Sequence, residues 1–364
     1  MSLFFLESKI FKRNSENRFF FNTIKINLGY EVSNVSKNNI IVAVGASAGG
    51  LQALSSFFDN TPEQSEYTFV IIQHLSPDHK SLMGELLAKN TKIPIVEISD
   101  DSPIKPGHIY MIPPTKNLRI DGNHFVLIEK PKGKTLNLPI DMFFESMAEH
   151  FKENCVGIVL SGTGSDGSRG ILSIKEQGGI VIVQQPEQAN FDGMPESAIN
   201  TGAVDFILPV QQMISEIDNY FKTPTVIAPG DDEMEYDEKV LQDILALLKK
   251  STDLDFSLYK KPTLVRRMAR RIKIIKADSL PDYLAYLKAH PEEIQILHKE
   301  FLIGVTKFFR DLKVWDILES EVVPELVRQK FDGEVLKIWD VGCSTGEETY
   351  SLAIVFLEEI KKQN

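Results

Sequence analysis

The feature that most constrains the fold is an uninterrupted apolar run at residues 40–44, which ends in a loop of small residues. The run reads IIVAV and has no polar alternation, which predicts a strand buried on both faces of a parallel sheet. The next residues read GASAGG, and apolar residues then recur at helical spacing from residue 51 to residue 58. The sequence therefore predicts a strand, a tight turn and a helix, with Ser47 exposed in the turn.

The turn around Ser47 has two interpretations. Residues 45–49 fit the nucleophile-elbow pattern G-x-S-x-G, and the N–H groups at the start of the following helix can stabilise an oxyanion. A phosphate-binding turn, or a turn that is merely tight, fits the same five residues equally well. The pentapeptide alone does not decide between them.

Composition sets limits on the kind of protein. A chain of 364 residues predicts two or more domains, and a 43% apolar content is enough for substantial cores. The net charge of −11 argues against a general nucleic-acid binder. Apolar runs of 18 residues are absent, so we expect no membrane span. Cys155 and Cys343 lie far apart in the sequence, which favours a reduced, cytoplasmic setting and no metal site.

The chain divides by pattern into five parts. Residues 1–38 show no sustained period and are predicted to be a poorly structured arm. Residues 39–221 alternate strands and helices, residues 222–237 have the Pro, Gly and acidic content of a linker, and residues 238–331 are helical throughout. Residues 332–364 begin with a predicted strand at 334–341, followed by a loop and a helix.

The alternating part predicts an α/β fold with a doubly wound, mostly parallel sheet. An Asp-Gly-Asn sequence at residues 121–123 lies between two apolar runs and predicts an antiparallel hairpin. Further strands are predicted at 68–73, 93–98, 108–112, 156–161, 180–184 and 204–208, and helices at 81–89, 142–152 and 168–177.

Three strand ends carry a Ser, a His and an Asp. Ser47 follows the first strand, His74 the second, and Asp166 lies in the loop after the strand at 156–161. Functional groups of open α/β sheets gather at the carboxyl ends of strands, and these residue types can form a nucleophile, a base and an orienting acid. Each residue taken singly is more often a turn former or a surface group. The order Ser, His, Asp also differs from that of α/β-hydrolases, so their fold is not the model.

The loop after residue 161 supports a competing hypothesis. Gly162, Gly164 and Gly167 satisfy G-x-G-x-x-G between a strand and a helix, and Glu187 follows about 20 residues later. This spacing is typical of dinucleotide binding. Asp166 argues against it, because its carboxylate would lie beside the pyrophosphate.

Residues 39–217 resemble the catalytic domain of chemotaxis protein-glutamate methylesterases of the CheB type. The matching sequences are GASAGG at 45–50, QHLSP at 73–77, IPP at 112–114, LSGTGSDG at 160–167 and MP at 194–195. The resemblance implies that Ser47 is the nucleophile, His74 the base and Asp166 the orienting acid, with no cofactor. It implies a methyl-esterified glutamate of a chemoreceptor as substrate, and deamidation of certain glutamines. Thr163 stands where the family usually has Met, and residues 1–38 could not form the family's receiver domain.

Residues 302–311 (LIGVTKFFRD) and 339–348 (WDVGCSTGEE) resemble chemotaxis receptor methyltransferases of the CheR type. That family transfers a methyl group from S-adenosylmethionine. The resemblance places Thr306, Arg310, Glu347 and Glu348 in cofactor-contacting motifs. The family's remaining strands would lie after Asn364, so the expectation is a shortened, inactive methyltransferase part that binds S-adenosylmethionine weakly or not at all.

The predicted helix around residues 264–275 has an apolar face opposite a basic one. A solvated basic face is the ordinary interpretation, and a dock for acidic receptor helices or for the acidic linker is the functional one. The leading hypothesis for the chain is a cytoplasmic serine esterase recruited to membrane receptor arrays without membrane insertion. The alternative is a catalytically silent binding or scaffold protein of a signalling array.

Overall fold

The structure is a computed structural model, and the chain forms two compact units, Ser33–Ile303 and Met1–Val32 with Gly304–Asn364. The described residues include no helix with the length and apolar character of a membrane span. The structure describes residues 8–13, 19–24, 39–73, 83–131, 136–223, 236–302, 308–310, 312–329 and 335–363.

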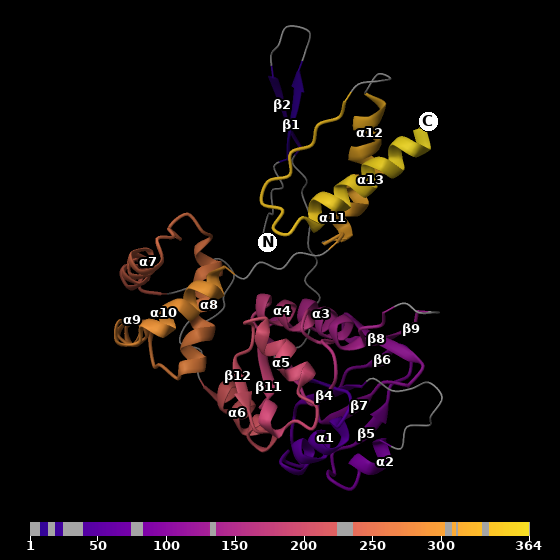
Figure 1. Cartoon of the computed structure of the whole chain (residues 1–364), viewed down its shortest axis with the longest axis vertical. Coiled ribbons are helices and arrows are strands. Elements are labelled where there is room, and N and C mark those ends of the chain that lie inside the picture. The colour runs from indigo at the N-terminus through magenta and orange to yellow at the C-terminus, as the bar shows by residue number, and fades with distance from the viewer. Residues whose placement is uncertain are drawn as a thin grey trace. The chain divides into compact units, whose positions relative to one another are not determined.

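A seven-stranded parallel sheet forms the centre of the larger unit (Figure 1). Its strand order is β12-β11-β10-β3-β4-β7-β5. Strands that follow β3 in the sequence therefore lie on both sides of it. This arrangement confirms the predicted doubly wound topology. It also creates a switch point at the carboxyl ends of β3 and β10, where ligands of such folds bind. The strands are β3 (Ile41–Ala46), β4 (Thr68–Gln73), β5 (Ile95–Glu97), β7 (His108–Met111), β10 (Cys155–Val159), β11 (Ile180–Gln184) and β12 (Phe206–Leu208).

Helices cover both faces of this sheet, which explains why the β3 sequence shows no alternation. Ile41 and Ala43 belong to the core beneath α3, α4 and α5, whereas Val42 and Val44 belong to the core beneath α1, α2 and α6. Both faces of the strand are therefore fully buried. The helices are α1 (Gly50–Asp59), α2 (Met83–Leu87), α3 (Pro139–Phe151), α4 (Gly170–Glu176), α5 (Gly193–Asn200) and α6 (Val210–Lys222).

The predicted hairpin is confirmed, with Gly122 at φ +57° in its two-residue loop. It does not join the large sheet. It forms a separate antiparallel sheet of β6 (Ser102–Pro103), β9 (His124–Glu129) and β8 (Lys116–Asp121), whose apolar side chains extend the core under α3.

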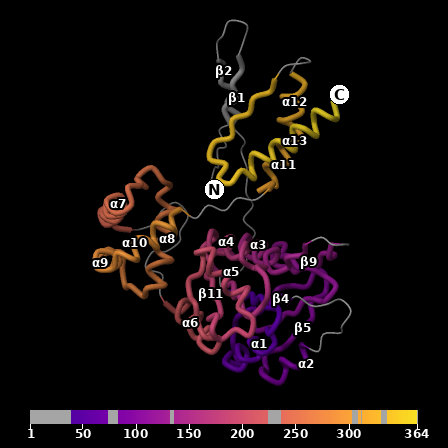
Figure 2. The backbone as a smooth tube through the Cα atoms, in the orientation of Figure 1, coloured from indigo at the N-terminus to yellow at the C-terminus, as the bar shows by residue number. Residues whose placement is uncertain are grey.

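Four helices after the linker form a separate core within the larger unit. Fully buried Tyr283, Phe256 and Met268 lie at its centre. Asp237 caps the first of these helices by accepting hydrogen bonds from the N–H groups of Lys239 and Val240. Figure 2 shows the course of the backbone through them. They are α7 (Glu238–Thr252), α8 (Lys261–Ile275), α9 (Leu280–Ala289) and α10 (Pro291–Phe301).

The smaller unit differs from the sequence expectations in two places. Strands β1 (Ser8–Arg13) and β2 (Phe19–Ile24) form an antiparallel ribbon in the arm, where the sequence shows no period. The predicted strand at 334–341 is wrong for its described residues: residues 335–340 have no regular structure, and Trp339 is 72% exposed. A strand needs a hydrogen-bonding neighbour, and this segment has none among the described residues. The unit's helices are α11 (Leu312–Ile317), the π-helical turn Leu318–Val322, α12 (Val323–Arg328) and α13 (Glu347–Gln363).

Candidate active site

Ser47 lies in the tight turn between β3 and α1, at the switch point of the sheet. Gly49 adopts a left-handed conformation with φ +73°, and the N–H of Gly50 donates to the Ser47 carbonyl at 2.9 Å. The turn is therefore closed on itself immediately before the helix begins. The serine is half-buried at the carboxyl edge of the sheet. This geometry is the predicted strand, turn and helix.

The loop after β10 holds the Ser47 turn in place from the neighbouring strand. The N–H of Ser47 donates to the carbonyl of Ser161 at 3.0 Å, and the Ser161 hydroxyl donates to the carbonyl of Ala48 at 2.9 Å. Gly162 presses against the same serine, because a Cβ built on it would lie 2.9 Å from the Ser47 Cβ. Only glycine fits at this contact.

Ser161 is in turn fixed from a third strand. Its N–H donates to the Gln184 side-chain oxygen at 2.8 Å at the end of β11, and its hydroxyl accepts from the N–H of Phe191 at 3.0 Å. Sequence reasoning did not single out Ser161 or Gln184. The run of Ser and Gly at residues 161–167 was the available signal, since such runs mark backbone-directed hydrogen bonds.

Asp166 is buried in the same loop and accepts three backbone hydrogen bonds. The N–H groups of Ile140 and Asp141 donate to it at 3.0 and 2.9 Å, and that of Gly167 at 3.0 Å. Ile140 and Asp141 lie in the first turn of α3, so the carboxylate neutralises orphan donors at a helix N-terminus. The structure thus gives Asp166 an anchoring role that the sequence did not reveal.

Asp141 in turn accepts hydrogen bonds from the end of the loop that carries Asp166. Its Oδ1 accepts from the N–H groups of Arg169 and Gly170, at 3.0 and 2.8 Å, where α4 begins. Burial raises the pKa of Asp141 from 3.8 to about 6; the Gly170 and Arg169 N–H groups oppose the rise, and the charge of Asp166 adds to it. Sequence reasoning missed Asp141, although an acidic residue in a helix's first turn after Pro139 is a recognisable signal.

These contacts argue against the dinucleotide hypothesis. In a dinucleotide site the N-terminal N–H groups of the helix after the glycine-rich loop bind the pyrophosphate. Here the N–H groups of Arg169 and Gly170 are occupied by Asp141. Glu187 lies exposed in the short 3-10 turn Pro186–Gln188.

His74 lies outside the described residues. The strand before it, β4, pairs with β3 in a register that places Gln73 opposite Ala46. Ser47 and His74 therefore follow directly from paired residues at the carboxyl ends of adjacent strands. Ser47 and Asp166 are brought to this same edge by β3 and β10, which pair through Gly45 and Val159.

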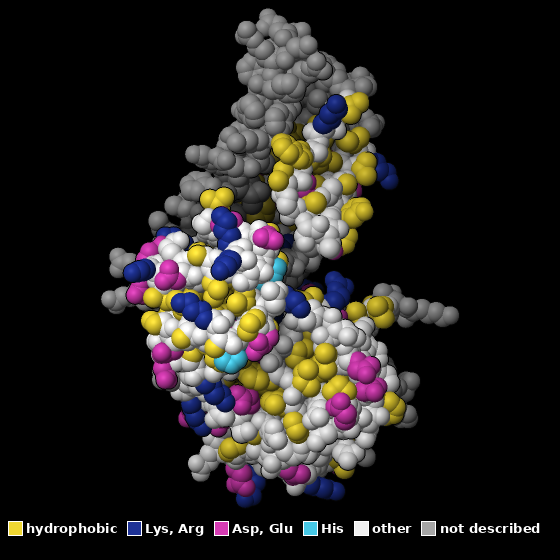
Figure 3. Space-filling view, turned by 60° about the vertical axis from the view of Figure 1, so that its left-hand side comes forward, with side chains coloured by type: hydrophobic (Ala, Val, Ile, Leu, Met, Phe, Trp, Pro, Cys, Tyr) yellow, Lys and Arg dark blue, Asp and Glu magenta, His cyan; other side chains and the backbone are white. Residues whose placement is uncertain are grey.

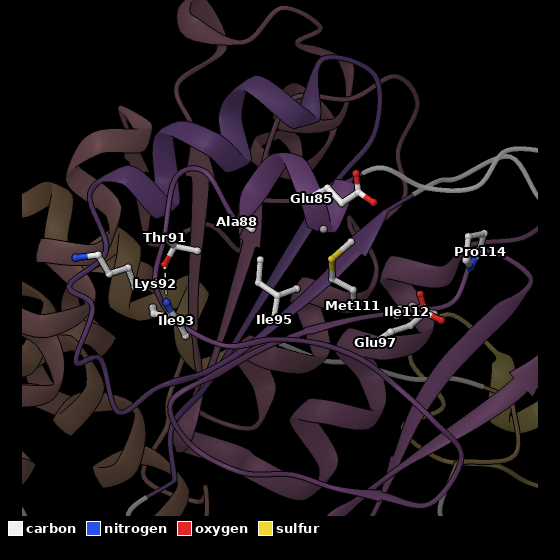
Figure 4. Close-up of a pocket in the computed structure, with 11 residues that line it drawn as sticks. Glu85, Ala88, Thr91, Lys92, Ile93, Ile95, Glu97, Met111, Ile112 and Pro114 are labelled. Carbon is white, nitrogen blue, oxygen red and sulfur yellow. Dashed lines mark hydrogen bonds between the residues drawn. The ribbon is translucent and has the colours of Figure 1, made fainter.

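A hollow of about 560 Å³ lies elsewhere on the domain, between α2 and the ends of β5 and β7. Ile95 and Met111 lie side by side in its lining, with Glu85 and Glu97 on the Met111 side (Figure 4). Ser47 and Asp166 do not line it.

The residues that resemble a methyltransferase site lie in the smaller unit. A loop with left-handed residues at Gly342, Ser344 and Gly346 leads into α13, with half-buried Glu347 and exposed Glu348 in its first turn. Arg310 is exposed, and Thr306 lies outside the described residues. The loop and helix fit one edge of a nucleotide-like cofactor, but the described residues supply no sheet beneath them, so the fit is incomplete.

Three family models match successive parts of the chain. The CheB methylesterase model matches residues 42–217. The all-alpha domain of the CheR methyltransferase matches residues 239–302, and its SAM-binding domain matches residues 304–364. The matches follow the division into an α/β domain, a helical domain and a glycine-loop segment.

Individual relatives agree with these models. A protein of Leptospira interrogans, provisionally named protein-glutamate methylesterase/protein-glutamine glutaminase, is 33% identical over 47% of this chain and 90% of its own length. One of that name from Trichodesmium erythraeum is 34% identical over 49% of this chain and 51% of its length. An uncharacterised 104.1 kDa protein of Rhodobacter capsulatus is 36% identical over 77% of this chain, which spans 32% of that protein.

The crystal structure of the Thermotoga maritima CheB methylesterase catalytic domain is 27% identical, with a TM-score of 0.46 over 50% of this chain and 97% of that domain. The Leptospira relative exceeds 30% identity and is covered almost completely. With this relative and the family models, the chain belongs to the CheB methylesterase family, and its later segments match the CheR methyltransferase models.

Proposed function

We propose that residues 39–221 form a serine esterase that hydrolyses methyl esters of glutamate side chains on chemoreceptors or similar signalling proteins. The observation that carries this proposal is the junction of the β3 turn and the β10 loop. Ser47 lies at the carboxyl edge of the sheet, and Asp166 is anchored in the loop that follows the neighbouring strand β10. The names of the Leptospira and Trichodesmium relatives supply the substrate class.

In the proposed reaction the Ser47 oxygen attacks the ester carbonyl carbon, and its proton passes to His74. The tetrahedral intermediate collapses as the methoxy oxygen takes that proton from His74 and leaves as methanol, which forms an acyl-serine. Water then attacks this ester with His74 again as base, which releases the glutamate carboxylate and restores Ser47. Loss of ammonia from a glutamine side chain would follow the same course, as the relatives' glutaminase name suggests.

Asp166 is proposed to orient His74 and to stabilise its protonated form. An orienting carboxylate must be immobile, and the three N–H donors of Ile140, Asp141 and Gly167 hold this one. The backbone N–H groups that follow Gly50 in the first turn of α1 are proposed to stabilise the oxyanion, because their dipoles point toward the Ser47 turn. Thr163, which stands where the family usually has methionine, is exposed.

Labelling with a fluorophosphonate tests whether Ser47 is activated. The serine oxygen attacks the phosphorus of the probe, fluoride leaves and a phosphonate ester forms, and this reaction requires a serine made nucleophilic by a neighbouring base. We expect one modified peptide, with the label on Ser47, and no labelling of the His74→Ala variant. An unlabelled wild-type chain would favour the silent scaffold protein instead.

We further propose that the segment at residues 304–363 binds S-adenosylmethionine weakly by itself. Its loop at residues 341–346 can form the turn beneath the cofactor, with Glu347 and Glu348 following. Residues 335–340 are not paired in a sheet, and Val335 and Trp339 expose 74% and 72% of their surface. A cofactor held against such a segment would lack a fixed wall, so no methyl-transfer step is assigned to it.

A further inference from the structure

Four buried charged side chains form a closed ring inside the larger unit. Lys175 contacts Asp205 at 2.7 Å and Glu300 at 2.9 Å, while Arg270 contacts Glu300 at 2.8 Å and also pairs with Asp205. Each of these side chains is at most 4% exposed. Charges alternate around the ring, so its net charge is zero.

Each domain supplies one cation and one anion to this ring. Lys175 on α4 and Asp205 before β12 belong to the esterase domain, whereas Arg270 on α8 and Glu300 on α10 belong to the helical domain. Removing charges from water is unfavourable, and this cost is offset only when the buried charges are well paired. If the two domains separated, each charge would keep only the ion-pair partner in its own domain. The ring therefore favours one specific docked arrangement.

Backbone groups of the esterase complete the recognition of Arg270. Its Nε donates to the carbonyl of Gly179 at 3.0 Å, and the Val181 N–H donates to the second oxygen of Asp205 at 2.9 Å. Gly179 is itself fixed, because a Cβ there would lie 2.5 Å from the sulfur of Cys155. The guanidinium therefore meets a rigid fork of one carbonyl and one carboxylate.

The contact continues beyond the ring along α8. Ile274 packs against the esterase core, and the Lys273 ammonium lies 5.3 Å from the ring centroid of Tyr220 on α6. Lys276 pairs with Glu216 at 3.3 Å where α8 ends.

Of the other charged residues of α8, Lys261 and Arg266 are exposed and Arg271 pairs with Glu293 of α10, whereas Arg270 is buried in the contact with the esterase domain. Figure 3 shows basic and acidic side chains interspersed on the visible surface.

The contact lies at the edge of the sheet opposite to the candidate site. Gly179 and Asp205 immediately precede β11 and β12, at the amino ends of these parallel strands, whereas Ser47 follows the carboxyl end of β3. The docked helices therefore leave the carboxyl edge of the sheet uncovered.

We propose that the side of α8 that carries Arg270 and Lys273 is the esterase domain's own docking surface, with the helical domain permanently seated on the amino edge of the sheet through the ring Lys175–Asp205–Arg270–Glu300. In this arrangement Arg270 recognises a site within the chain, and an acidic receptor helix does not displace it.

Crosslinking in the full chain tests the proposal. The parent chain carries Cys343→Ser, Glu216→Cys and Lys276→Cys. The two new thiols lie on opposite sides of the contact, and a short bismaleimide can join them. We expect Arg270→Met to slow crosslinking at least tenfold. Arg266→Met, which removes an exposed arginine one turn away on the same helix, should change it less than twofold. Equal crosslinking rates in the two variants would overturn the proposal. A slower crosslinking rate of the parent chain in the presence of a Glu-rich helical peptide would overturn it as well.

Hydrogen exchange of the wild-type chain gives a second test that does not depend on a variant folding. Permanent docking requires that amides of α8 and of β11 open together, with exchange rates at their slowest positions agreeing within about tenfold. If the slowest-exchanging amides of α8 exchange more than a hundredfold faster than those of β11, the helical domain detaches from the esterase domain. That result would contradict the proposal.

Discussion

Asp141 and Asp166 each hold the start of a helix through backbone hydrogen bonds. Each carboxylate accepts the N-terminal N–H groups of a helix, α4 for Asp141 and α3 for Asp166. The two helices are thereby locked to the loop after β10. The proposed orientation of His74 by Asp166 thus depends on a carboxylate that backbone dipoles already hold in place.

Asp141→Asn should stabilise the chain at neutral pH. The folded state raises the pKa of Asp141 from 3.8 to about 6 because the carboxyl is buried, so ionisation above that pH opposes folding. The folded state binds the extra proton between these two values, and this contribution to stability therefore falls as pH rises from about 4 to about 6. An asparagine keeps the acceptor for Arg169 and Gly170 without the charge.

The measurement is chemical unfolding of both chains across pH. The difference in free energy of unfolding, variant minus wild type, should increase by about 2–3 kcal/mol between pH 4 and pH 7. Asp192→Asn, at an exposed position, is the matched control and should give a constant difference. A pH-independent difference for Asp141→Asn would show that burial does not penalise its charged form.

The rate of ester hydrolysis should fall as pH drops below the pKa of His74, about 6.5 if the imidazole is unperturbed. The base must be neutral to accept the serine proton. Initial rates on methylated receptor between pH 8 and pH 5 would report this pKa, with His150→Gln as a histidine control on α3. A flat profile over that range would exclude His74 as the kinetically visible base.

At the scale of elements, the close approach of the β10 loop to the Ser47 turn fixes the geometry of the site. Gly162→Ala would place a methyl group 2.1 Å from the Met194 sulfur and 2.9 Å from the Ser47 Cβ. We expect a loss of about 1–3 kcal/mol in stability. A displacement of the serine by less than 1 Å should lower kcat/KM by about a hundredfold.

Gly84→Ala is the matched control, because its methyl group would lie 3.5 Å from Met111, at ordinary contact distance. Comparing kcat/KM and the unfolding midpoint of both variants separates the site effect from a general cost. Unchanged activity of Gly162→Ala would show that the β10 loop does not position Ser47.

The elements that the sequence predicted correctly are those whose pattern is local. The buried run at 40–44, the helical spacing after Leu51 and the Gly122 turn each specify one element without reference to the rest of the chain. The segment at 334–341 also contains apolar residues, interrupted by Lys337 and Asp340, but it forms no strand in its described part, because a strand depends on neighbours that the local pattern does not supply.

Side-chain partners separated widely in sequence were not predictable. Lys175 and Arg270 are 95 positions apart in the sequence and meet only because the amino ends of β11 and β12 face α8. The anchoring of Asp166 by α3 depends likewise on tertiary packing. The residue types of the candidate site could be named from strand ends, but their hydrogen-bond partners could not.

At the scale of the whole molecule, the two units are expected to differ in ligand binding and protection. Calorimetric titration with S-adenosylmethionine should give no binding stronger than about millimolar, since residues 335–340 provide no fixed wall. Hydrogen exchange should be fast in the same segment, where Trp339 and Val341 are exposed. Micromolar binding together with strong protection of residues 335–346 would show a working cofactor site.

The central claim is that Ser47 is the nucleophile of a methylesterase. The most direct measurement is methanol release from a methyl-esterified chemoreceptor by the full chain and by its Ser47→Ala variant, with Ser55→Ala on α1 as the serine control. Since the acyl intermediate requires the Ser47 oxygen, we predict that Ser47→Ala lowers the rate by at least a thousandfold, while Ser55→Ala stays within twofold of wild type. Methanol release by Ser47→Ala at the wild-type rate would contradict the claim.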